Sequence, residues 1–169
     1  MARFLKLVPV RIAMVGSVIL AMQATVFTEM RPFGVVCDFM LGFAIAAGVI
    51  GGPTPGMLAG FILGIMVDLN LATPFGLSPL VYGLMASLAG LVKSSITQGQ
   101  AWWLSMILVF ACSAIGVVAY GALGTLVGRV GWFRYSLLTD AAVIATANAL
   151  IAHPATVVQR WALALTRDA

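Results

Sequence analysis

The fold of this chain is decided by residues 56–91, which read GMLAGFILGIMVDLNLATPFGLSPLVYGLMASLAGL. Glycine recurs at every fourth position in the first part of this stretch, at Gly56, Gly60 and Gly64. The stretch carries one charge, at Asp68, and a Thr-Pro-Phe-Gly cluster at 73–76 interrupts it. Such a cluster ends one helix and begins another. We therefore predict two membrane helices here. We expect the glycine stripe to lie inside a bundle, because small residues let helix backbones approach closely in lipid.

The composition of the whole chain extends this prediction beyond the one stretch. The chain has 169 residues, of which 62% are hydrophobic and 8% are charged, and its mean hydropathy is +1.10. A soluble domain carries about 25% charged residues, so an ordinary soluble enzyme is excluded. The few charges separate long apolar runs, and a spanning helix needs about 20 such residues. The predicted spans are 11–29, 33–51, 55–70, 75–93, 101–127 and 136–153.

The predicted architecture is an all-α integral membrane protein, a bundle of about six transmembrane helices of which the third is short. Residues 1–153 are expected to form a single polytopic transmembrane domain, and residues 154–169 a short amphipathic helix at the cytoplasmic membrane surface. With six crossings, six Lys and Arg residues fall on the side of the termini and three on the other side. This asymmetry favours two cytoplasmic termini.

The first predicted span carries a stripe of small residues at a spacing of four: Ala13, Ser17, Ala21 and Thr25. In lipid, such stripes form the seams between helices of one protein or the surface that a partner helix contacts. The short, Gly-rich third span is expected to use its stripe internally. The first span is the better candidate for a partner surface, since terminal helices often lie at the rim of a bundle.

Three polar side chains in the predicted spans need an explanation. Asp38 lies near the start of the second span, Asp68 near the end of the third, and Asn148 deep in the sixth. A carboxylate at membrane depth costs several kcal/mol unless it is paired or hydrated. The two aspartates either form an ion or proton site, as in a proton-coupled carrier, or bond to backbone amides or arginines and fix loop geometry, which we favour. We expect Asp68 and Asn70 to tie the turn at 74–76, and Asn148 to bond another helix.

No group of residues in the sequence makes a catalytic set. We find no Ser/His/Asp grouping, no phosphate loop in a strand–helix context and no spacing typical of metal ligands. The cations are scattered at the ends of segments, which argues against a surface for nucleic acid. We therefore expect a protein that is not an enzyme, that needs no cofactor or metal, and that contacts membrane lipid and protein partners through its spans.

The stretch 56–91 resembles the bacterial rod shape-determining protein MreD family, which combines a short Gly-rich span, a turn and a further span. The matching residues are Gly60, Phe61, Gly64, Asp68, Leu69, Pro74, Phe75, Gly76, Leu77 and Leu80. Asp38, and the order of Asn148 and then Pro154, resemble two further patterns of the family. The chain departs from the family at one position, since Cys37 precedes Asp38 where family members often carry proline.

The resemblance implies a multi-pass component of the bacterial inner (cytoplasmic) membrane. Such a protein is a non-catalytic scaffold of the cell-elongation complex that binds MreC through membrane helices, with MreB, RodA and a transpeptidase as indirect partners. It helps to position lateral peptidoglycan synthesis and to maintain cell shape. The family's fold is thought to be similar to the substrate-binding subunits of energy-coupling-factor transporters, which are also six-helix bundles. The alternative interpretation is therefore a small-molecule-binding membrane subunit of a vitamin-type transporter.

Overall fold

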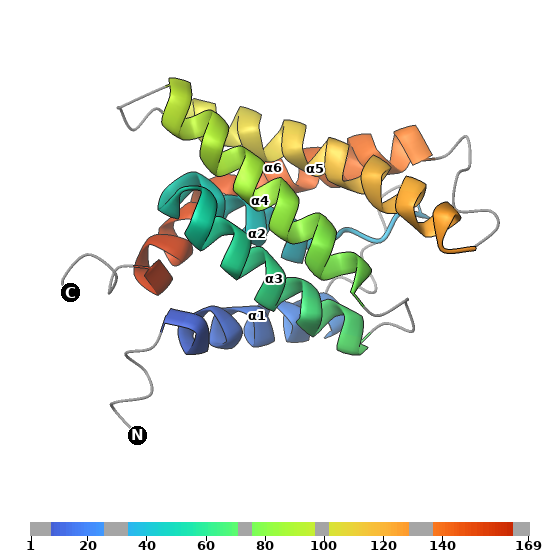
Figure 1. Cartoon of the computed structure of the whole chain (residues 1–169), viewed down its shortest axis with the longest axis horizontal. Coiled ribbons are helices and arrows are strands. Elements are labelled where there is room, and N and C mark those ends of the chain that lie inside the picture. The colour runs from blue at the N-terminus through green and yellow to red at the C-terminus, as the bar shows by residue number, and fades with distance from the viewer. Residues whose placement is uncertain (1–7, 26–33, 71–75, 97–101, 129–136, 164–169) are drawn as a thin grey trace.

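The computed structural model describes residues 8–25, 34–70, 76–96, 102–128 and 137–163 (Figure 1). Within these ranges the chain forms six helices: α1 (Val8–Thr25), α2 (Phe39–Gly51), α3 (Pro53–Asn70), α4 (Leu77–Ile96), α5 (Trp102–Leu126) and α6 (Leu137–Leu163). Four of these helices, α1, α4, α5 and α6, are long and apolar enough to cross a membrane. Within the described ranges, the prediction of an all-α chain with six helices is therefore confirmed, and four of the six predicted spans correspond to helices that could cross a membrane.

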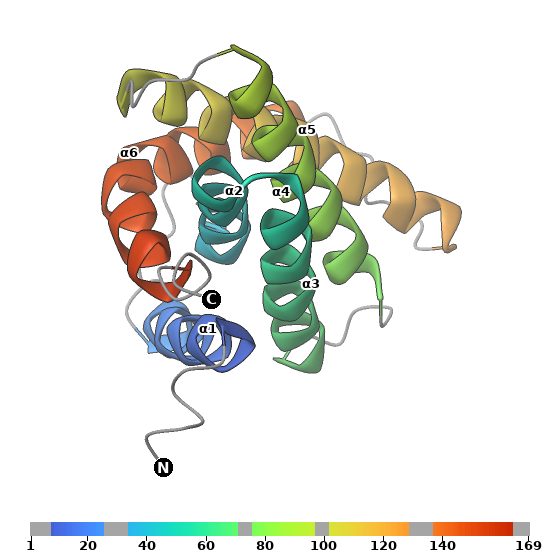
Figure 2. The ribbon, with the colours of Figure 1, turned by 60° about the vertical axis from the view of Figure 1, so that its left-hand side comes forward.

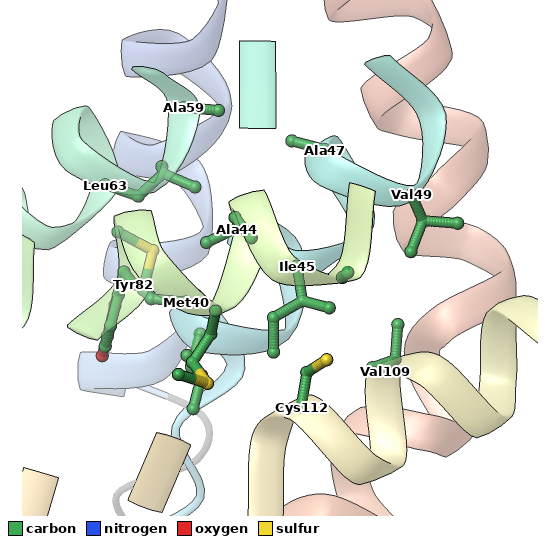
Figure 3. Close-up of a cluster of buried hydrophobic side chains, with 14 of the residues drawn as sticks. Met40, Ala44, Ile45, Ala47, Val49, Ala59, Leu63, Tyr82, Val109 and Cys112 are labelled. Atoms are coloured by element: carbon green, nitrogen blue, oxygen red, sulfur yellow. The ribbon is translucent and has the colours of Figure 1, made fainter. Parts of the chain in front are cut away.

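Helix α2 lies in the middle of the bundle, and the other helices pack around it (Figure 2). The side chains of Met40, Ala44 and Ile45 are fully buried among residues of the neighbouring helices (Figure 3). The sequence of α2 is apolar on every side, as expected of a helix that is buried all round. Its 13 residues rise only about 20 Å, less than the roughly 30 Å of a hydrocarbon core.

Helices α3 and α4 pack backbone against backbone along the predicted glycine stripe. A methyl group on Gly64 would lie 2.4 Å from the Cα atom of Pro79. A methyl group on Gly60 would lie 2.5 Å from the carbonyl oxygen of Tyr82. Such distances leave room only for the hydrogen of glycine. The expectation that this stripe lies inside the bundle is therefore confirmed.

Successive helices run in alternating directions (Figure 1). The two ends of the bundle differ in the charged residues that lie towards them. We call the end where α1 begins and α6 finishes the terminal end. The described cations lie towards it: Arg11, Lys93 and Arg160. We call the opposite end the acidic end, because the described carboxylates lie towards it: Asp38, Asp68 and Asp140. The described part of the chain thus separates its charges along the direction of the helices.

The first and last helices are joined at the terminal end. The guanidinium group of Arg11 in α1 donates a hydrogen bond of 3.0 Å to the carbonyl oxygen of Trp161 in α6. The same group lies over the Trp161 ring, 4.7 Å from its centroid, a distance at which a cation is attracted to the ring face. The described chain therefore begins and finishes at the same end of the bundle.

The second helix begins later than predicted, at Phe39. The carboxylate of Asp38 caps it by accepting a hydrogen bond of 3.3 Å from the backbone nitrogen of Leu41, and such a cap favours a helix that begins just after it. Asp38 therefore precedes the helix instead of lying one or two turns inside it. Because α3 has 18 residues, the shortest helix is α2, and the prediction that the third is the short one is wrong.

The last helix does not end near His153, as predicted, but continues through Pro154 to Leu163. A proline inside a helix removes one backbone hydrogen bond and bends the helix without always ending it. Helix α6 accordingly curves around α2 (Figure 2). Its last turns bury Thr156 and Gln159 against the bundle and expose Trp161. The separate helix predicted from residue 154 is thus part of α6 as far as Leu163, and residues 164–169 lie outside the described ranges.

Candidate functional site

A cluster of polar groups at the acidic end is built on residues 35–38, the non-helical segment before α2. Asp38 ends this segment. Its carboxylate accepts hydrogen bonds from the backbone nitrogen of Leu41 and from the hydroxyl group of Tyr82 in α4. A buried or half-buried carboxylate requires such donors, because unpaired charge is costly away from water. The cluster therefore fixes the start of α2 against α4.

Asn148 joins the same segment to two further helices. It is fully buried in α6, and its side-chain nitrogen donates to the carbonyl oxygen of Asp38 (3.0 Å) and to the hydroxyl of Ser113 in α5 (3.1 Å). Gly42 makes room for this amide, since a methyl group there would lie 2.7 Å from the Asn148 Oδ1 atom. The predicted interhelical hydrogen bond of Asn148 is confirmed.

Two buried contacts of glutamine escaped the sequence analysis. Gln23 of α1 donates a hydrogen bond of 3.1 Å to the carbonyl oxygen of Cys37. Gln159 of α6 donates one of 3.1 Å to the carbonyl oxygen of Phe43 in α2. Non-helical backbone at membrane depth needs protein partners for its polar groups, and Gln23 supplies one for the segment before α2. These contacts could have been suspected from the sequence, because glutamine side chains among apolar residues often donate hydrogen bonds between helices in membrane proteins.

Asp68, near the end of α3, is hydrogen-bonded to the residue that precedes α4. One of its carboxylate oxygens accepts a hydrogen bond of 2.6 Å from the backbone nitrogen of Gly76. Gly76 has φ of 104°, a conformation that favours glycine, and it directs the chain into Leu77, the buried first residue of α4. The expected tie from Asp68 is therefore confirmed. Asn70 instead donates to a carbonyl oxygen of its own helix (3.0 Å).

The residues quoted for the family resemblance do not converge on one site. Gly60 and Gly64 lie in the seam between α3 and α4, whereas Phe61 is 50% exposed on another face of α3. Pro154 is exposed in the last helix. Two members of the motif lie outside the described ranges: Pro74 and Phe75. Most of these residues therefore shape helix packing and turns.

The small-residue stripe of the first helix lies on the outside of the bundle. Ser17, Ala21 and Thr25 are exposed, and Ala13 is half-buried. The Ser17 hydroxyl donates to the carbonyl oxygen of Ala13 (2.9 Å), and the Thr25 hydroxyl donates to that of Ala21 (2.7 Å). Because both hydroxyl groups donate hydrogen bonds within their own helix, the stripe presents a smooth surface without an unsatisfied hydroxyl donor. We call these four residues the α1 stripe.

A groove of about 370 Å³ opens between α1 and α3 beside the α1 stripe. It is lined by Ser17, Leu20, Ala21, Ala24, Met66, Leu69 and Asn70. Leu69 is 70% exposed, so the α3 side of the groove is also open to the surroundings. The α1 stripe and this groove together form a small-residue surface that the described part of the structure leaves uncovered.

The comparisons with known proteins come back empty. No family model, no curated protein and no solved structure matches the chain. The likeness to the MreD family therefore rests on the residues quoted above. In the parts of the chain that the structure describes, no three His, Cys, Asp or Glu side chains are grouped so that they could hold a metal ion.

Proposed function

We propose that this chain is a non-catalytic membrane scaffold that binds a partner's transmembrane helix on the α1 stripe. The observation that carries the proposal is the exposure of Ser17, Ala21 and Thr25 on a helix that is long and apolar enough to cross a membrane. A second helix can approach such a surface closely and gain dispersion contacts. A partner helix that packs there breaks no hydrogen bond of the stripe, because the hydroxyl groups of Ser17 and Thr25 already donate to carbonyl oxygens of α1.

The groove between α1 and α3 supports the same surface. A partner helix that packs on the α1 stripe also meets Met66 and Leu69 of α3, which form the other wall of the groove. Two walls bury more of a partner than one helix face does, and close packing is the main source of affinity between helices in lipid. The partner surface that we propose is therefore the α1 stripe together with this groove.

The resemblance to the MreD family supplies the biological setting of the proposal. In that setting the partner is MreC, and the assembly is the elongation complex of a bacterial inner membrane, with MreB, RodA and a transpeptidase as indirect partners. The scaffold then helps to position lateral peptidoglycan synthesis. The charge separation supports an orientation: Arg11, Lys93 and Arg160 lie towards the terminal end, and the cation-rich side of a membrane protein faces the cytoplasm.

The double variant Ser17→Leu/Ala21→Leu tests the proposal. Two leucines on the stripe keep a partner helix at a distance, so we expect at least a tenfold loss of co-purified MreC. The fold should persist, because both positions are exposed. The melting temperature should stay within about 2 °C of the unchanged protein.

The matched control is Ala142→Leu/Thr146→Leu on α6. These two residues are also exposed and four positions apart, and the Thr146 hydroxyl is likewise bonded to the carbonyl oxygen of the earlier alanine (2.7 Å). We expect this variant to keep its MreC. An equal loss in both variants, or no loss in the first, would contradict the assignment of the partner surface to α1. A rise in melting temperature with a vitamin-like compound would instead support the transporter-subunit alternative.

A further inference from the structure

A separate groove of about 320 Å³ opens at the acidic end, between residues 34–36, α5 and α6. Most of its side chains are aliphatic: Val35, Val36, Val117, Leu137 and Ile144. Two polar side chains also line it, Tyr120 of α5 and Asp140 of α6. Neither the partner surface on α1 nor the hydrogen bonds of Asp38 and Asp68 use this groove.

The groove lies beside the last turns of α5 and the first turns of α6, which we expect at the level of the lipid headgroups. Helix α5 has 25 residues and α6 has 27, so they rise about 37 and 40 Å. The hydrocarbon core is only about 30 Å thick, and the ends of both helices therefore extend into the headgroup layer. Asp140 lies in the first turn of α6, and Tyr120 lies within two turns of the end of α5.

The polar groups of this groove suit a cation that carries hydrogen-bond donors. A carboxylate such as that of Asp140 accepts hydrogen bonds, and an aromatic ring such as that of Tyr120 attracts a cation. The Tyr120 hydroxyl already accepts a hydrogen bond of 3.5 Å from Ser78. Among the residues that the structure describes, those that line the groove include no lysine, arginine or histidine. The aliphatic walls suit the short hydrocarbon stem on which such a cation is carried.

We propose that this groove binds the primary ammonium group of a phospholipid headgroup, such as that of phosphatidylethanolamine. Val36 in the wall of the groove is 53% exposed. The rim is therefore apolar and open to the bilayer, where lipids are always at high concentration. This setting favours a lipid over a basic side chain of another protein. The proposal does not depend on the scaffold function.

The test is native mass spectrometry of the full chain with three dioctanoyl lipids: phosphatidylethanolamine, phosphatidylcholine and phosphatidylglycerol. Phosphatidylcholine has the same charges but no N–H donor, and phosphatidylglycerol has no ammonium group. A carboxylate–ammonium contact near water is worth up to about 1 kcal/mol, so we expect about fivefold preference for phosphatidylethanolamine. Asp140→Asn should abolish the preference, and Asp140→Glu should retain it.

Equal binding of the three lipids by the unchanged protein overturns the proposal. An unchanged preference in Asp140→Asn also overturns it, since the carboxylate would then be occupied within the chain. If Asp140→Asn keeps the lipid preference but loses a protein partner, the groove serves a basic side chain and the lipid assignment is wrong. Should Asp140→Asn fail to fold, Asp140→Ser provides the second variant: it also removes the carboxylate, and it should abolish the preference.

Discussion

The stripes of small residues in α3 and α1 have the same spacing and opposite surroundings. In α3, Gly60 and Gly64 lie so close to the backbone of α4 that a methyl group on either would overlap it. In α1, Ser17 and Ala21 face outward and line an open groove. Small residues at a spacing of four therefore mark a helix face that another helix can approach closely. Whether that other helix belongs to the same chain or to a partner depends on how the rest of the bundle is arranged.

The contact between α1 and α3 differs from the contact between α3 and α4 in the kind of atoms that meet. A methyl group on Gly16 of α1 would lie 2.6 Å from Leu63 Cδ2 and 2.8 Å from Met66 Sδ, the far ends of two side chains of α3. Side-chain ends can rotate away, whereas the backbone of α4 cannot. Helix α1 is thus attached to the bundle by adjustable contacts, and α3 is locked to α4 by rigid ones.

The largest effect is expected from Gly64→Ala in the rigid seam. The new methyl group would lie 2.4 Å from the Cα and backbone nitrogen atoms of Pro79, so α3 and α4 must separate. We expect a destabilisation of about 3 kcal/mol or more and little folded protein in detergent-solubilised membranes. The measurement is the monodisperse yield by size-exclusion chromatography. A normal yield and an unchanged melting temperature would show that this seam is looser than described.

An intermediate effect is expected from Asp68→Ala at the end of the same helix. The change removes the hydrogen bond between the backbone nitrogen of Gly76 and the carboxylate, and a typical hydrogen bond contributes about 0.5–1.5 kcal/mol to stability. Membrane accumulation and melting temperature should both fall, with Asp68→Asn as the control that keeps an acceptor oxygen. Normal accumulation of Asp68→Ala together with lost cell-shape activity would instead identify Asp68 as a functional residue.

The smallest effect is expected from Gly16→Ala in the adjustable seam. Leu63 and Met66 can move to admit the methyl group, and alanine is the better helix former by about 1 kcal/mol. We expect the melting temperature to stay within about 3 °C of the unchanged protein. A loss as large as that of Gly64→Ala would break the distinction between the two seams.

Much of the fold was predictable because apolar runs and Gly/Pro clusters are local signals. The six helices and the buried glycine stripe follow from them. The start of α2 and the length of α6 were missed because tertiary contacts set them. Asp38 begins α2 with the help of Tyr82, a residue 44 positions away, and Pro154 stays inside α6 because the helix packs on α2 on both sides of the bend.

The candidate site was predictable only in part. Asn148 and Asp68 stand out because strongly polar groups are rare in apolar runs, and both make the bonds expected of them. Tyr82 was not noticed, because a tyrosine in a membrane helix is ordinary until its acceptor is known. The α1 stripe could be named from spacing alone, but its exposure depends on where five other helices lie, and no local pattern reports that.

The contact between Arg11 and Trp161 has a consequence for how the protein is made. The two residues are 150 positions apart, and synthesis at roughly 5–20 residues per second separates them by about 8–30 seconds. During that interval α1 has no contact with α6, although α3, against which Gly16 packs, is made much sooner. Because the hydroxyl groups of Ser17 and Thr25 are bonded within α1, the α1 stripe can face acyl chains before α6 is made, so the surface proposed for a partner is also compatible with lipid during synthesis.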